Sequence, residues 1–331
     1  MTDPAATGPG PPGRSMLNRL QLLVTRRLDG LLQGEYLGLL PGAGTELGES
    51  REYQAGDDVR RMDWPVTART TVPHVRQTEA DRELETWLAV DLSASMDFGT
   101  AEYLKRDLVV AAAAAMIHLT ARGGNRVGAV VATGQRSWHL PARSGSRGAQ
   151  ALLRAIATVP TGVPGDVDLA ALIERLHRPR RRRGLAVVIS DFLTPPHAWV
   201  APLRRLGVRH ELLAVEVVDP RELALPDVGV LDLIDPETGQ VLEVQTADPR
   251  LRQRYAEAAA AQRAAIVAGL RAAGAGHLQL RTDRDWLTDV VRYVASRRTA
   301  RRRGAAGPRA GAGGRPRLAA AGAGGRREEA G

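Results

Sequence analysis

Three oxygen-bearing side chains occur at every second position directly after an apolar stretch of the chain. Asp91, Ser93 and Ser95 follow the apolar run at 84–90. If this loop is extended, the three side chains point the same way, because side chains alternate along an extended chain. One carboxylate and two hydroxyls suit a hard cation such as Mg²⁺, which prefers about six oxygen ligands. In the alternative interpretation, these side chains only cap the helix that follows.

A second aspartate stands in the same kind of position later in the chain. Asp191 follows the continuous apolar run at 185–190. If the two runs are parallel strands of one sheet, their carboxyl ends meet at one edge, where ligands of such sheets bind. The sequence therefore predicts that Asp191 supplies a second carboxylate, directly or through water, to a divalent-cation site formed with Asp91.

Apolar runs with the length of buried strands alternate with segments of helical periodicity. This alternation predicts an α/β fold in which a mostly parallel sheet is covered by helices on both faces. The expected strands are 84–90, 126–133, 138–140, 185–190, 211–218 and 277–281. The expected helices are 100–122 (capped by Thr100), 147–157, 169–177, 197–206, 250–273 and 286–297, and a hairpin tip is expected at 235–239.

Composition divides the chain into four parts. Residues 1–14 are expected to be disordered, 15–80 to hold a helix at 15–32 followed by short strands and turns, 81–297 to form the α/β domain, and 298–331 to be a disordered Arg/Gly/Ala tail. The segment 297–331 carries ten arginines and two glutamates, so a net +8 of the chain's +9 lies there. The part expected to fold is therefore nearly neutral.

Composition also excludes several chemistries. No cysteine occurs among the 331 residues, which rules out disulfides, thiolate metal sites and cysteine nucleophiles. Lys105 is the one lysine, and no glycine-rich loop precedes it, so a Walker-type phosphate loop is ruled out. The seven histidines show no His-x-x-x-His spacing, and no Gly-x-Ser-x-Gly elbow occurs. A zinc site and an α/β-hydrolase triad are therefore not indicated.

Two motifs together resemble a known bacterial family. Asp91-Leu92-Ser93-Ala94-Ser95-Met96 resembles the metal-ion-dependent adhesion site (MIDAS) of von Willebrand factor A domains. Upstream, Arg51-Glu52-Tyr53, Gly56-Asp57-Asp58, Arg60, Asp63-Trp64 and Ala68-Arg69 resemble the signature of a bacterial family of unknown function, domain of unknown function fifty-eight. The resemblance covers about residues 34–297. It implies a Rossmann-like von Willebrand factor A domain with a divalent cation at the top of its sheet.

The resemblance also implies which residues hold the cation. Asp91, Ser93 and Ser95 match the first loop of the family pattern, and Asp191 matches the aspartate of the third loop. The second loop departs from the pattern, because Val167 stands where a threonine is expected and valine has no oxygen to donate. Its neighbours Asp166 and Asp168 could supply a carboxylate instead, which would make the site more anionic.

The family resemblance implies a non-enzymatic, divalent-cation-dependent interaction module. Its expected partner is a MoxR-type AAA+ ATPase or a client of that ATPase, with the chain as adaptor or co-chaperone. The alternatives are a metal-dependent hydrolase of phosphate esters that uses the aspartate cluster, and a nucleic-acid binder that acts through the arginine tail, which could also make a weak polyanion contact.

The sequence also carries a prediction about location. The N-terminal residues lack the apolar core of a signal peptide, and the apolar run at 108–119 is too short to span a bilayer. We therefore expect a cytoplasmic protein.

Overall fold

The computed structural model describes residues 50–54, 57, 59, 62–76, 85–121, 125–134, 136–161, 163, 165–177, 184–235 and 239–305. The helix expected at 15–32 and the disordered segment expected at 1–14 lie outside these residues, as does the tail beyond residue 305.

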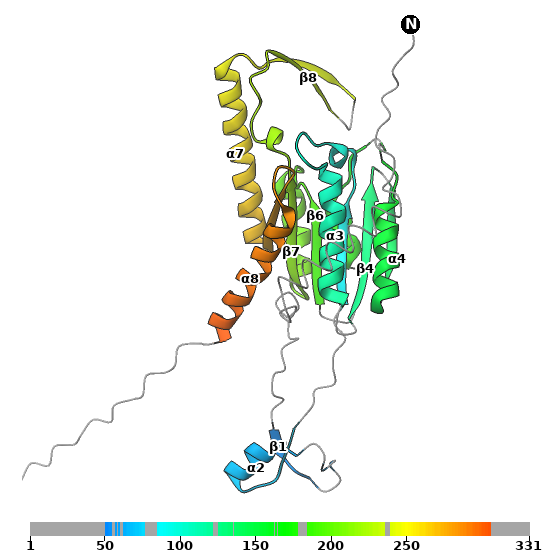
Figure 1. Ribbon diagram of the computed structural model, residues 1–331, viewed down its shortest axis with the longest axis vertical. Helices are drawn as coiled ribbons and strands as arrows, with labels where there is room; N and C mark the ends of the chain where they lie inside the picture. Colours follow the sequence, from blue (N-terminus) through cyan, green and yellow to red (C-terminus); the bar gives the residue numbers. More distant parts are fainter. Residues whose placement is uncertain are drawn as a thin grey trace, which may run out of the picture.

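A six-stranded sheet forms the centre of the fold, in the order β10-β7-β6-β3-β4-β5 (Figure 1). All neighbours pair in parallel except β5, which is antiparallel to β4. β3 and β6 are neighbours, in register from Glu85 with Gly184 to Val90 with Ile189, so their carboxyl ends lie side by side. The strands are β3 (Glu85–Asp91), β4 (Arg126–Thr133), β5 (Arg136–Arg143), β6 (Gly184–Ser190), β7 (His210–Val218) and β10 (Gly276–Arg281).

Helices cover both faces of this sheet and enclose two apolar cores (Figure 1). Along β3, Leu88 and Val90 belong to one core and Trp87 and Ala89 to the other, because successive side chains point to opposite faces. The first core takes in α3 (Lys105–Ala121), α4 (Gly145–Ala157) and α8 (Trp286–Ala305), and the second takes in α5 (Leu169–Glu174), α6 (Pro196–Gly207) and α7 (Pro249–Ala272). This arrangement confirms the predicted α/β class with a mostly parallel sheet.

A small unit precedes the α/β domain in sequence. β1 (Ser50–Glu52) pairs antiparallel with β2 (His74–Arg76), and α2 (Trp64–Thr70) lies between them in the chain. The strands agree with the short strands expected in this segment, but α2 was not predicted. Asp63 caps this helix by accepting a hydrogen bond from the Val66 N–H at 3.3 Å, and Pro65 stands in its first turn, where proline is favoured.

A two-stranded hairpin lies beyond the carboxyl ends of the main strands (Figure 1). It consists of β8 (Val230–Ile234) and β9 (Val241–Gln245), on either side of the turn expected at 235–239. The remaining elements are the 3₁₀ helices η3 (Ala94–Asp97), η5 (Arg175–His177) and η6 (Pro220–Glu222). Within the described ranges, no helix combines the length and apolar character needed to cross a bilayer.

Two expected boundaries are wrong. α3 begins at Lys105 rather than near residue 100, and Thr100 does not cap it. Thr100 instead donates its backbone N–H and its hydroxyl to Asp219, at 2.8 and 2.6 Å. The last helix was expected at 286–297, but α8 continues to Ala305. Arginine and alanine are both good helix formers, which accounts for a helix that runs into the start of the expected tail.

Candidate functional site

Acidic residues stand at the carboxyl ends of three neighbouring strands. Asp91 is the last residue of β3, Asp191 follows β6, and Asp219 follows β7. All three carboxylates are buried. In Figure 1 this edge of the sheet faces the β8–β9 hairpin. The two aspartates chosen from the sequence are therefore placed as predicted, and a third, Asp219, joins the same edge.

Asp91 is fixed by hydrogen bonds to both of its carboxylate oxygens. Oδ1 accepts the backbone N–H of Ser93 at 3.0 Å, and Oδ2 accepts the hydroxyl of Ser190 at 2.8 Å. Burial, together with the negative charge of Asp191, raises the pKa of Asp91 to about 6, although these hydrogen bonds oppose the shift. The ionised form of Asp91 is therefore held at a cost in free energy.

The two serines connect the first loop to Asp191. The hydroxyl oxygens of Ser93 and Ser95 lie 3.0 Å apart, and the Ser95 hydroxyl donates to Oδ2 of Asp191 at 2.9 Å. Oδ1 of Asp191 accepts the backbone N–H of Leu193 at 3.2 Å. The structure thus brings together the four residues predicted from the first and third loops.

A buried lysine, which the site prediction did not include, completes the cluster. The ammonium of Lys105 lies 2.8 Å from Oδ2 of Asp191 and 2.6 Å from Oε1 of Glu222, and its side chain is fully buried. Burial by itself would raise the pKa of Asp191, but the Lys105 ammonium outweighs it and holds that pKa below its usual value. Burial would likewise lower the pKa of Lys105, but the two carboxylates raise it. Lys105 and Asp191 are therefore a charged pair.

Glu222, in the loop after β7, contacts this lysine. Hydrogen bonds within the loop hold it in place. Asp219 and Glu222 form a capping box on η6: Asp219 accepts the N–H of Arg221 at 2.9 Å, and Glu222 accepts the N–H of Asp219 at 3.0 Å. Oδ2 of Asp219 also accepts the hydroxyl of Thr282 at 2.7 Å. Burial would raise the pKa of Asp219, but these bonds and those from Thr100 lower it.

The loop after β6 carries local backbone strain. Phe192 has a φ of 56°, in the left-handed region that a bulky residue rarely adopts. Its N–H donates to the Ser190 hydroxyl at 3.2 Å, and its buried ring packs edge-on against Trp199, with 5.3 Å between ring centroids. This packing holds the backbone of Asp191, the preceding residue, in one position.

The second loop does not contribute the predicted carboxylates. Asp166 is exposed, and the Asp168 side chain caps α5 by accepting the N–H of Ala171 at 2.9 Å. Val167 is buried in the core on the α5 and α6 side of the sheet. The expectation that Asp166 or Asp168 replaces the missing threonine is therefore not supported, and for Asp168 the helix cap is the physical reason.

The divalent cation implied by the family resemblance can be tested against these donors. The oxygens of the first and third loops are gathered, but the second loop offers the side chain of Val167, and an ammonium already lies against Asp191. Across the residues that the structure describes, no three His, Asp or Glu side chains group closely enough to hold a metal ion. The donor set, with Lys105 in place, does not fit the expected cation.

A second buried charge cluster lies nearby on β7. Glu216 receives the guanidinium of Arg263 at 2.5 Å and Nε2 of His277 at 2.8 Å, and Gln279 donates to it at 3.1 Å. Burial would raise the pKa of Glu216, but His277 and Arg263 lower it. Arg263 also donates to the backbone carbonyl of Asp191 at 3.4 Å, so this cluster contacts the loop after β6.

The site predicted from the sequence did not include Lys105, nor Asp219 and Glu222 after β7, although two signals for them were present. Lys105 is the only lysine in a chain that otherwise uses arginine, and Asp219-Pro220-Arg221-Glu222 has the spacing of a capping box after a strand. Neither signal indicates by itself which carboxylate the lysine pairs with, because that contact depends on how α3 packs across the sheet.

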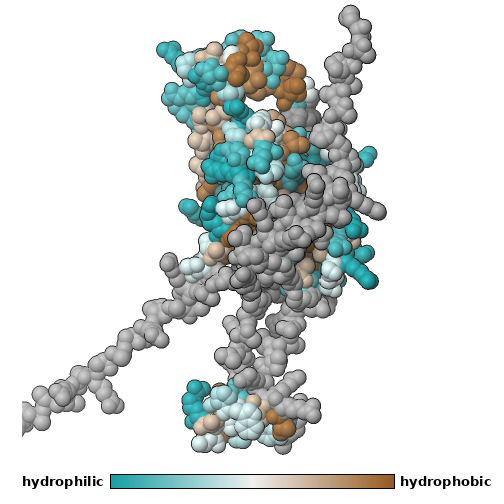
Figure 2. Space-filling view, in the orientation of Figure 1, coloured by the Kyte–Doolittle hydropathy of each residue, from teal (hydrophilic) through white to brown (hydrophobic). Residues whose placement is uncertain are grey.

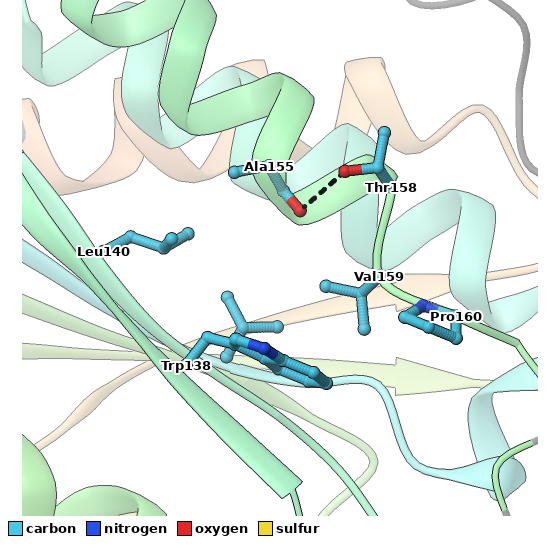
Figure 3. A pocket seen from close by; sticks show the side chains of 7 residues that line it. Trp138, Leu140, Ala155, Thr158, Val159 and Pro160 are labelled. Carbon is cyan, nitrogen blue, oxygen red and sulfur yellow. Dashed lines mark hydrogen bonds between the residues drawn. The ribbon is translucent and has the colours of Figure 1, made fainter.

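An apolar hollow occurs elsewhere, between β4, β5 and α4 (Figure 3). Its lining is Val131, Trp138, Leu140, Ala155, Thr158, Val159 and Pro160. The hydroxyl of Thr158 donates to the carbonyl of Ala155 at 3.3 Å, the bond drawn in Figure 3. None of the described residues that line this hollow is titratable, so they offer no acid–base chemistry.

The fold and the strand-end cluster define an α/β module with a polar site at the carboxyl edge of a parallel sheet. The chain belongs to the family described as protein of unknown function DUF58, whose pattern matches residues 49–265. It is 59% identical over 285 residues to the uncharacterized protein Rv1480 of Mycobacterium tuberculosis, with 85% of this chain and 89% of that protein covered. It is 54% identical over 162 residues to the uncharacterized protein MAV169 of Mycobacterium avium, covering 48% of this chain and 94% of that one.

Solved structures with a similar course of the chain have low sequence identity. The hypothetical protein BatB of Bacteroides thetaiotaomicron is 16% identical, with a TM-score of 0.40, covering 65% of this chain and 99% of that one. An aerotolerance-related membrane protein of Bacteroides fragilis is 17% identical, with a TM-score of 0.41, covering 66% and 99%. A von Willebrand factor type A protein of Catenulispora acidiphila is 10% identical, with a TM-score of 0.36, covering 68% and 43%.

Proposed function

We propose that this protein is a non-enzymatic protein-interaction module whose contact face includes the β8–β9 hairpin at the carboxyl edge of the sheet. One observation carries this proposal: the hairpin exposes large apolar side chains. Val230, Ile234, Val241 and Leu242 are each more than half exposed. Figure 2 shows hydrophobic residues gathered at this end of the molecule. An exposed group of apolar side chains rimmed by polar residues is typical of a protein-binding surface.

The strand-end cluster supports a structural rather than a catalytic role. Asp91, Asp191 and Asp219 each accept several hydrogen bonds from their own protein, and Lys105 is paired with two carboxylates. A hydrolase would need a free base or a metal-bound water beside its substrate. A role as a phosphoesterase therefore has less support than a role in which the strand-end cluster stabilises a protein-contact face.

The proposed partner is a MoxR-type AAA+ ATPase, as the family resemblance implies. The test is a binding assay between the purified full chain and AAA+ ATPases co-expressed from the same bacterium. Val241→Ser replaces an apolar side chain of the hairpin, and Val208→Ser makes the same change at an exposed valine at the end of α6. Their exposed fractions, 62% and 78%, make them a matched pair.

We expect Val241→Ser to weaken capture of the ATPase about five- to tenfold, the effect of losing an interface side chain worth just over 1 kcal/mol. Val208→Ser should bind like the parent chain. Equal binding by both variants would contradict a contact through the hairpin, and failure of the parent chain to capture any such ATPase would contradict the partner. A parallel arm with EDTA tests the cation dependence that the family resemblance implies. Because the donor set around Lys105 does not fit that cation, we expect EDTA to leave capture unchanged.

A further inference from the structure

We propose that the ammonium of Lys105 takes the place of a divalent cation at the carboxyl edge of the sheet, so that this site is built to work without a bound metal ion. In this proposal the ammonium holds the three strand-end loops together. It does not depend on whether the hairpin binds an ATPase, and its test does not use partner binding.

The ammonium of Lys105 lies where three loops meet. Lys105 begins α3, the helix that follows the Asp91 loop, and it contacts Asp191 after β6 and Glu222 after β7. One positive charge thus connects three loops that come from three strands. A metal ion at this edge would have the same structural effect, because it would draw oxygens from several loops to one point.

The ammonium and the expected cation would compete for one oxygen of Asp191. Lys105 and Ser95 both donate to Oδ2 of Asp191, at 2.8 and 2.9 Å, and Ser95 is in turn 3.0 Å from the Ser93 hydroxyl. An ion ligated by these two serines and Asp191 would therefore lie close to the ammonium. Two like charges at such a distance repel each other strongly in a buried site.

The rest of the donor set does not suit a divalent cation either. The family pattern expects an oxygen from the second loop, but Val167 is buried there and Asp168 caps α5. A second cation, Arg263, donates to the backbone carbonyl of Asp191 at 3.4 Å. Two cationic side chains, Lys105 and Arg263, are thus already described around Asp191. A divalent metal ion would place a third cation there, with fewer oxygen ligands than it prefers.

The single lysine makes this proposal directly measurable in the full-length protein. If the chain is labelled with ¹³C at lysine Cε, one side-chain NMR signal reports Lys105. Paramagnetic Mn²⁺ bound against Asp191 would broaden that signal beyond detection. We expect the signal to persist in about 1 mM Mn²⁺, a concentration that fills even weak oxygen-ligand sites. Loss of the signal with one equivalent of Mn²⁺ would overturn the proposal.

Substitutions distinguish the effect of the Lys105 ammonium on metal binding from the effect of the oxygen that Val167 lacks. Val167→Thr restores the donor expected in the second loop but leaves the ammonium, so we expect no new site. The double variant Lys105→Met/Val167→Thr removes the competing charge and should bind one Mn²⁺ at least tenfold more tightly than the parent chain, measured by calorimetry. Arg106→Met/Val167→Thr is the matched control, because Arg106 is the next residue of α3 and is also buried, but pairs with Asp97.

Either of two results would overturn the proposal: tight Mn²⁺ binding by Val167→Thr alone, or equal binding by the Lys105 and Arg106 double variants. If the Lys105 double variant does not fold, the NMR measurement on the parent chain still decides the question, since it needs no substitution.

Discussion

Asp91 offers a stability test of how the site is held, because its charge is buried close to that of Asp191. Its pKa is about 6 in the folded protein, against 3.8 as the ordinary value. A difference of about two pKa units corresponds to about 3 kcal/mol between the protonated and ionised forms. The folded state therefore retains a proton that the unfolded chain releases, and stability falls by about this amount as the pH rises through the range between the two values.

The substitution Asp91→Asn removes this penalty. The amide oxygen can still accept the N–H of Ser93, while Ser190 must turn its hydroxyl to accept from the new amide nitrogen. Allowing about 1 kcal/mol for that rearrangement, we expect the variant to be more stable than the parent chain by about 2 kcal/mol at pH 8, and equal or slightly less stable near pH 4.

Urea unfolding of both chains from pH 4 to pH 8, in buffer with EDTA, measures the difference in free energy of unfolding at each pH. Asp166→Asn is the control, because Asp166 is an exposed carboxylate in the neighbouring loop, and its difference should stay near zero. A difference for Asp91→Asn that does not change with pH would refute the reasoning. So would a variant less stable than the parent at pH 8.

Other substitutions test the surrounding structure, each by chemical denaturation. Lys105→Met leaves two carboxylates without their cation and should cost about 3–5 kcal/mol; a cost below about 1 kcal/mol would show that the buried pair is weak. Gly184→Ala places a Cβ 1.8 Å from the carbonyl oxygen of Glu85, so the variant should fail to fold or lose more than about 3 kcal/mol, whereas a stable variant would contradict the close approach of β6 to β3. Asp219→Ala leaves four buried or partly buried hydroxyl and N–H donors without an acceptor and should cost about 2–4 kcal/mol. Because the pKa of Asp219 is lowered in the folded state, its contribution is present above pH 4 and is lost on acidification, and a cost that grows at low pH would contradict this sign.

The positions of Asp91 and Asp191 could be predicted from the sequence because the evidence for them is local. Each follows an apolar run with the length of a buried strand, and parallel strands carry their carboxyl ends to one edge of the sheet. The serines after Asp91 could be placed for the same reason. The β5 pairing and most helices of the α/β domain also follow from local periodicity, but the start of α3 and the end of α8 differ from the expected positions by five and eight residues.

The contacts that complete the site were not predictable in the same way, because they join residues far apart in the chain. Threonine is a common helix-capping residue, so Thr100 was expected to cap α3. Its backbone N–H and its hydroxyl instead both donate to Asp219, which lies 119 positions away in the chain. Lys105 pairs with Asp191 across 86 positions. Asp168 was expected to contribute to the site, but its carboxylate instead accepts the N–H of Ala171 in the first turn of α5, the helix that follows it.

The central claim is that a lysine ammonium, and not a metal ion, lies against Asp191. The most direct measurement is a crystal structure of the full chain grown in Mn²⁺, with anomalous data collected to locate manganese. We predict no manganese peak between Asp91 and Asp191, and the ammonium of Lys105 within hydrogen-bond distance of both Asp191 and Glu222. A manganese peak ligated by Ser93, Ser95 and Asp191, with Lys105 displaced from the carboxylate, would contradict the account.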